Sequence, residues 1–207
     1  VYSGDRIDSF VTIGSTVIVA SPDINDTSRL DVIEPIGGDS QRLVLPEDTR
    51  IDQLIAPASG TSALFTASSV DEAGPYDRTL FVVDVAGSPR AEPLTGLDGQ
   101  TLRVTKAAPV PGSSRVLAWV DDIRVVSIDL TTGLVLPLAE EAQEFWGVSS
   151  NGKHVIIVDV GGTVAINIDT LEEQRLIPGL IGTREVFEGQ THLMGDSRRV
   201  QTVVLSN

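Results

Sequence analysis

One small unit recurs five times along this chain, and the repeat constrains the fold more than any other feature. Each unit contains an apolar run, a turn glycine, a second apolar run and a third run followed by an acid. A period of roughly 40–50 residues is typical of propeller-type arrays. The turn glycines are Gly14, Gly60, Gly112, Gly152 and Gly189. The acids after the third runs are Glu34, Asp84, Asp129 and Asp169.

The apolar runs have the composition of β-strands. They are short, rich in Val, Ile, Leu and Thr, and bounded by Gly, Pro, Asp or Ser. A lone four-stranded sheet has two apolar faces, and stacking such sheets around an axis buries both. The sequence therefore predicts an all-β protein, a β-propeller of about five four-stranded blades, either complete or a fragment of a larger propeller. In a single domain, the blades are expected at 5–46, 51–96, 101–138, 143–179 and 183–207 plus 1–3.

The four strands of a blade are named A to D in chain order, and the A strands are expected to line the axis. Pairing of Val1–Ser3 with the final strand at 200–205 would close the ring. Only 138–145 has a helix-forming composition. The A-strand residues expected to face inward are Phe10, Leu54, Val104, Phe145 and Val186.

Composition excludes several partners and sites. The 207 residues carry a net charge of −14, and binding to duplex nucleic acid or anionic membranes needs clustered Lys and Arg. No apolar run reaches the roughly 18 residues that a membrane span needs. Cysteine is absent, so no disulfide, thiolate zinc site or cysteine nucleophile exists. We expect a monomer without membrane insertion, and a cationic or basic partner remains open.

Acids gather in the B–C and D–A loops, which share one end of a propeller; this end is called the loop face. The opposite end has a nearly balanced set: Asp39, Arg90, Arg115, Lys153, His154 and Glu172. A protein partner or cationic ligand is expected at the loop face, although Asp also collects in turns for conformational reasons. The expected partner-binding residues are Asp71, Glu72, Tyr76, Asp77, Trp119, Asp121 and Asp122.

The segment 21–28 is the one candidate metal loop. It offers Asp23, Asn25 and Asp26, and Ca²⁺ prefers oxygen ligands of this kind. The alternating spacing and downstream Glu of a calcium hand are missing, so a capped turn competes with a Ca²⁺ site. No other cofactor is expected.

Catalytic motifs are absent from the chain. It lacks the nucleophile elbow, the phosphate-binding loop, the dinucleotide fingerprint and the zinc-protease helix motif. His154 and His192 lie in different units and form neither a metal site nor a relay. We therefore predict a non-catalytic binding or sensor module. The alternative is the propeller domain of a hydrolase, glycosidase-like or gating a larger enzyme.

Three segments resemble a known family. Val148–Val158 (VSSNGKHVIIV) resembles the Ser-x-Asp-Gly-Lys turn of TolB-like and WD40-like bacterial propellers, with Asn151 in place of Asp. Arg124–Gly133 and Phe81–Gly87 look like the third strand of that family. The likeness covers the second to fourth units well. It implies a protein-binding scaffold or a sensor domain at the cell surface, on the extracytoplasmic side of a bacterium.

Overall fold

The computed structural model describes residues 7–34, 39–57, 59–70, 78–85, 88–96, 99–178, 183–187, 190–195 and 199–203. Side-chain surroundings are described up to Leu176, with Ile24 excepted. The clasp expected from Val1–Ser3 lies outside these residues, and so does the side chain of Val186. Among the described residues, no helix has the length and apolar character needed to cross a bilayer.

The described chain forms five antiparallel sheets in which each strand pairs with the next in sequence. The first contains β1 (Ser9–Ile13), β2 (Thr16–Pro22), β3 (Ser28–Ile33) and β4 (Ser40–Arg42), and the second β5 (Thr49–Ile55), β6 (Ser62–Ser69), β7 (Thr79–Asp84) and β8 (Arg90–Pro93). The third contains β9 (Val104–Pro109), β10 (Arg115–Val120), β11 (Arg124–Asp129) and β12 (Leu134–Ala139). The fourth contains β13 (Glu144–Val148), β14 (His154–Asp159), β15 (Gly162–Asn167) and β16 (Glu173–Pro178), and the fifth β17 (Thr183–Phe187), β18 (Gln190–Gly195) and β19 (Arg199–Val203).

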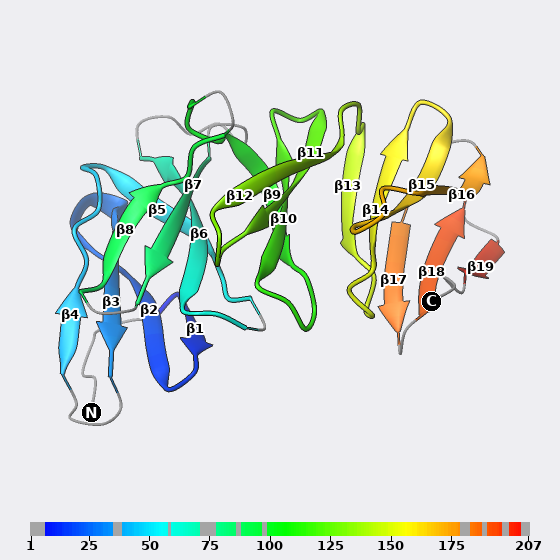
Figure 1. Cartoon of the computed structure of the whole chain (residues 1–207). Coiled ribbons are helices and arrows are strands. Elements are labelled where there is room, and N and C mark those ends of the chain that lie inside the picture. The colour runs from blue at the N-terminus through cyan, green and yellow to red at the C-terminus, as the bar shows by residue number, and fades with distance from the viewer. Residues whose placement is uncertain are drawn as a thin grey trace.

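These sheets are arranged as propeller blades, which confirms the predicted fold class. The sheets follow one another in chain order across the molecule, and the first and fifth lie at opposite ends of an open series (Figure 1). The A strands β1, β5, β9 and β13 contact one another in succession, so they lie on the inner side. The segment 138–145 forms no helix: β12 runs to Ala139 and β13 begins at Glu144.

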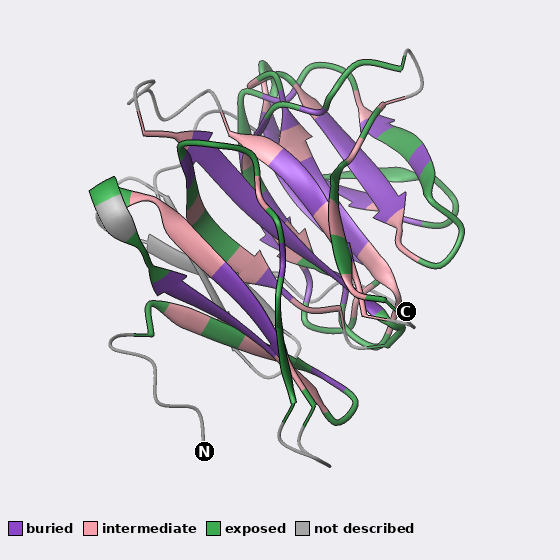
Figure 2. Ribbon diagram, turned by 90° about the vertical axis from the view of Figure 1, so that its left-hand side faces the viewer, coloured by how far each residue is buried: buried purple, intermediate pink, exposed green. Residues whose placement is uncertain are grey.

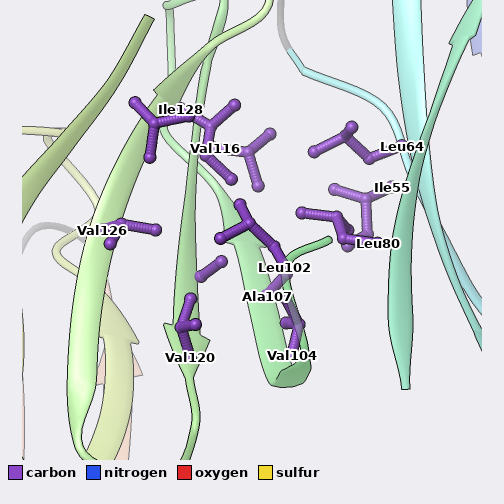
Figure 3. Packing of buried hydrophobic residues seen from close by; sticks show 12 residues of the cluster. Ile55, Leu64, Leu80, Leu102, Val104, Ala107, Val116, Val120, Val126 and Ile128 are labelled. Atoms are coloured by element: carbon purple, nitrogen blue, oxygen red, sulfur yellow. The ribbon is translucent and has the colours of Figure 1, made fainter. Parts of the chain in front are cut away.

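Apolar side chains fill the spaces between neighbouring blades. Separate buried clusters join the first blade to the second, the second to the third, and the third to the fourth. Burial is concentrated along the strands, and the connecting loops are largely exposed (Figure 2). Between the second and third blades, Leu64 and Leu80 face Val116 and Ile128 across the interface (Figure 3). Each blade therefore buries both faces only through its neighbours, as in other stacked repeats.

The prediction for inward A-strand residues was right in part. Val104 and Phe145 are fully buried, whereas Leu54 is half-buried. Phe10 is 64% exposed, which contradicts the prediction. The reason is the alternation of side chains along β1: Val11 and Ile13 face the second blade, so Phe10 points to the other side of its sheet.

The A–B turns pack against one another at the end opposite the loop face. Gly152 has φ +72°, and a Cβ there would lie 2.6 Å from the carbonyl oxygen of Pro111 in the preceding A–B turn. In the same turn, Oδ1 of Asn151 accepts a hydrogen bond from the Lys153 amide at 3.1 Å. An Asn oxygen does this as well as an Asp oxygen, so the departure from the family pattern at Asn151 leaves the turn intact.

In the fourth unit, the residue that closes the third strand differs from the sequence prediction. Asp129 closes β11 and accepts hydrogen bonds from the Thr131 and Thr132 amides at 2.8 and 3.4 Å. In the fourth blade the same place and the same contacts belong to Asn167, whose Oδ1 accepts from the amides of Asp169 and Thr170. The repeated position therefore requires an acceptor oxygen rather than a negative charge, and Asp169 was the wrong choice for it.

Candidate functional site

The B–C turn of the third blade places two of the predicted acids at the loop face. Asp121 and Asp122 have φ of 52° and 59°, and the Ile123 amide donates to the Val120 carbonyl at 3.2 Å. Asp enters this left-handed region more readily than most residues with a side chain. The turn therefore explains why Asp stands at both positions, and the acids are displayed at its tip.

Both carboxylates also have local partners. Asp121 forms an ion pair with Arg124, and the Thr105 hydroxyl donates to Oδ1 of Asp122. Thr105 is the extra residue of a β-bulge between β9 and β10. Bulges commonly re-aim a side chain near functional surfaces, and this one directs Thr105 to the B–C turn.

A matching bulge in the second blade extends this polar network. Asp52 is the extra residue between Ile51 and Gln53. Its carboxylate lies 3.3 Å from Nε of Arg78 and 3.7 Å from Nε of Arg50. Arg78 also donates to the Thr105 carbonyl at 3.3 Å, so the two inner strands are linked at the loop face.

A pocket of about 470 Å³ opens beside this network, between the second and third blades. Its apolar lining comes from Leu102, Val120, Val126 and Val135, all at most 7% exposed. In Figure 3, Leu102 lies between Val120 and Val126 on one side and Leu80 and Ile55 on the other. The charged residues of the lining are Arg103, Asp121, Arg124 and Glu140.

A second hollow, of about 390 Å³, lies at the loop face between the first and second blades. Its lining includes the acids Asp23, Glu47 and Asp48. Two arginines of the lining, Arg29 and Arg42, lie 2.8 and 3.5 Å from the carboxylate of Asp31, which is buried in β3. Both guanidinium groups are thus paired with a strand carboxylate.

The candidate calcium residues lie in the B–C loop of the first blade. Asn25 and Asp26 both have φ of 60°, in the short 3₁₀ turn η1 (Ile24–Asp26). The Asp23 amide donates to the Thr27 carbonyl at 2.8 Å, which closes the loop. This geometry is that of the competing capped turn. In the described part of the chain, no three His, Cys, Asp or Glu side chains cluster as metal ligands, and the Ca²⁺ site stays a prediction.

Of the remaining partner-binding residues predicted at the loop face, one is placed elsewhere by the structure and four lie outside the described residues. Trp119 packs against the core cluster between the third and fourth blades, because it points away from the neighbouring Val120. It does not line the pocket, and its buried Nε1 has no hydrogen-bond partner among the described residues. Trp146, the other tryptophan, is buried at 6% exposure. Asp71, Glu72, Tyr76 and Asp77 lie outside the described residues.

The contrast in charge between the two ends is weaker than the sequence suggested. Asp84 and Asp129 end their C strands at the opposite end, which is therefore acidic rather than balanced. The loop face in turn has Arg103 and Arg124, which loop composition missed because they stand at strand starts. Strand direction would have placed both arginines at the loop face. A C strand starts at this face, as β11 does at Arg124, and the loop that ends at Arg103 leads into an A strand from the same face.

One histidine is buried at the opposite end. His154 is 7% exposed, and its Nδ1 has no hydrogen-bond partner among the described residues. Burial lowers the pKa of His154, and the neighbouring charge of Lys153 lowers it further. Burial therefore favours the neutral imidazole, and no cluster of three or more metal-binding side chains is found in the described structure.

The fold and the loop face together define a β-propeller-type domain. A structure of dihydro-heme d1 dehydrogenase NirN in complex with DHE is similar at 16% identity and a TM-score of 0.55, over 89% of this chain and 40% of that one. The extracellular domain of the hybrid two-component system BT3049 from B. thetaiotaomicron is similar at 11% identity and a TM-score of 0.51, over 99% of this chain and 28% of that one. The extracellular domain of the one-component system BT4673 from the same organism is similar at 12% identity and a TM-score of 0.51, over 91% of this chain and 26% of that one.

These similarities concern the fold alone, because the identities are low. This chain spans less than half of each of the three structures. No protein-family model matches the chain. No curated protein matches it either.

Proposed function

We propose that this chain is a non-catalytic binding or sensor module that receives a basic protein partner or a cationic ligand on its loop face. The observation that carries the proposal is the set of exposed carboxylates that three blades present at one end, close to two hollows. Focused negative potential of this kind raises the local concentration of cations and speeds their association. The exposed acids are Asp23, Asp26, Glu47, Asp48, Asp121, Glu140 and Glu141.

Four arginines of the loop face form ion pairs with two strand carboxylates. Arg50 and Arg78 are paired with Asp52, and Arg29 and Arg42 with Asp31, as described above. Glu47 and Glu141 have no ion pair among the described residues. A basic partner can reach these two carboxylates without breaking an ion pair.

The similar structures support the sensor role and an extracytoplasmic location. Two of them are extracellular domains of one-component and hybrid two-component systems. The turn that resembles the TolB-like and WD40-like motif is held by hydrogen bonds from the Lys153 and His154 amides to Asn151 and Ser149, and we take this as support for membership of that group. A third similar structure is a dehydrogenase by its name, so the rival role is that of a propeller domain in a larger enzyme. The full-length gene, read for a membrane anchor or a flanking catalytic domain, discriminates between the two.

The charge reversal of Glu47 and Glu141 tests the partner surface. We expect Glu47→Lys/Glu141→Lys to weaken capture of an oligolysine peptide several-fold at low salt, and the wild-type binding to fall as salt rises. The matched control is Asp39→Lys/Glu172→Lys, which reverses two exposed acids at the opposite end. Equal losses in both variants, or wild-type binding that ignores salt, would rule out a specific acidic loop face.

A further inference from the structure

The pocket between the second and third blades has a wall that is fixed by backbone hydrogen bonds. The connector from β8 to β9 supplies Leu102 and Arg103 to the lining. The Leu102 carbonyl accepts from the Leu80 amide at 3.2 Å, and the Val104 amide donates to the Arg78 carbonyl at 2.7 Å. On its other side, the Arg103 carbonyl accepts from the Asp121 amide at 3.2 Å. The connector is thus anchored to both blades, and the pocket is preformed.

The lining combines an aliphatic floor with charges of both signs. Leu102, Val120, Val126 and Val135 belong to the buried core cluster and also line the pocket. The Asp121–Arg124 pair neutralises itself at the B–C turn. The lining also contains two exposed residues of opposite charge, Arg103 from the connector and Glu140 from the end of β12. A cationic and an anionic residue from different elements therefore border the apolar base.

We propose that this pocket binds a short aliphatic peptide with free termini. The aliphatic side chains would rest on the valine and leucine floor, the peptide carboxylate would bind Arg103, and the peptide ammonium would bind Glu140. Guanidinium–carboxylate contacts are among the stronger hydrogen bonds in proteins. Pockets for small ligands typically enclose about 300–1,000 Å³, with an apolar lining and a few polar groups that fix orientation. At about 470 Å³ the pocket is large enough for a di- or tripeptide.

This inference goes beyond the proposed partner surface. The basic partner is placed by exposed loop acids, whereas the peptide site depends on the pocket floor and on one charge of each sign. Glu140 lines the pocket, and Glu141, the next residue, does not. The two residues therefore make a matched pair that separates the peptide site from general acidity of the loop face.

Calorimetric titration with three probes tests the site: free trileucine, N-acetyl trileucine and trileucine amide. Free trileucine is expected to bind, and each cap is expected to weaken binding about tenfold, because each removes one charged contact. Glu140→Gln should weaken free trileucine about tenfold and abolish its advantage over the acetylated probe. Arg103→Gln should abolish its advantage over the amide. Glu141→Gln should bind like the wild-type chain.

Three outcomes overturn the proposal. These are no binding of free trileucine, equal binding of all three probes, and equal losses in Glu140→Gln and Glu141→Gln. Both glutamates are exposed, so their amide variants are expected to fold, and a far-UV spectrum checks this. Loss of oligolysine capture in Glu47→Lys/Glu141→Lys with trileucine binding retained would show that the two surfaces act separately. Retention of both oligolysine capture and trileucine binding in this variant would refute the partner surface alone.

Discussion

Replacement of Gly152 by Ala tests how closely successive blades pack at their A–B turns. Two effects oppose the new Cβ. The residue has φ +72°, a left-handed conformation that costs a residue with a side chain about 1–2 kcal/mol. In addition the Cβ would lie 2.6 Å from the Pro111 carbonyl oxygen and 3.4 Å from Cγ1 of Val110. Both atoms belong to the third blade, and the nearer one is backbone that cannot rotate away.

Gly112 provides the matched control. It is the turn glycine of the preceding blade and also has φ +72°, but a Cβ there meets nothing within 4 Å. Gly112→Ala therefore measures the backbone cost alone, about 1–2 kcal/mol. Forced overpacking typically adds roughly 1–3 kcal/mol, so Gly152→Ala should lose about 2–5 kcal/mol in total. For a domain of this size, each kcal/mol corresponds to a fall of roughly 2–4 °C in melting temperature.

Urea denaturation followed by far-UV circular dichroism measures both variants. The unfolding free energy must depend on urea concentration with the same slope in the wild type and in both variants, so that their urea midpoints can be compared. The reasoning fails if Gly112→Ala and Gly152→Ala lose equal stability. That result would mean that the fourth blade does not press its turn against Pro111, and that the glycine serves only its own turn.

Two further predictions concern the same end of the molecule. Burial lowers the pKa of His154, so its stabilising effect is complete above the unfolded pKa near 6.5 and is lost as pH falls through the folded value. His154→Asn should flatten the decline of melting temperature below about pH 6.5, and an unchanged decline would contradict this. Arg115 lies 2.6 Å from Asp169 of the next blade in an exposed pair. A double-mutant cycle with alanine should give a coupling of at most about 1 kcal/mol that shrinks as salt rises, and a salt-independent coupling would contradict the pairing.

Most strands could be predicted because local chemistry decides them. The apolar runs form strands in the structure, since short β-branched runs between Gly, Pro and Asp have few alternatives. The acceptor at the end of the third strand was harder to place. Asn167 makes the contacts of Asp129, but a search for acids selected Asp169, because the printed sequence does not say that the turn needs an oxygen rather than a charge.

The candidate site was predicted less well than the fold. The sequence indicated the acidic turn at Asp121 and Asp122, and these residues do lie at the loop face. It did not indicate the pocket, since Leu102 and Arg103 come from the connector and Val135 comes from a D strand more than thirty residues later. It also misjudged Trp119, which packs into the core because strand alternation turns it away from Val120.

The sequence by itself determined the repeat, the all-β fold and the order of strands within each blade, because turn glycines and apolar runs act over a few residues. Tertiary structure alone decided what lies between blades. The β-bulges at Asp52 and Thr105 direct polar side chains to a shared edge, and the connector through Leu102 is fixed by hydrogen bonds to two different sheets. A pocket of this kind exists only after the connector has packed on the third blade, since its lining comes from these two parts of the chain and neither encloses it alone.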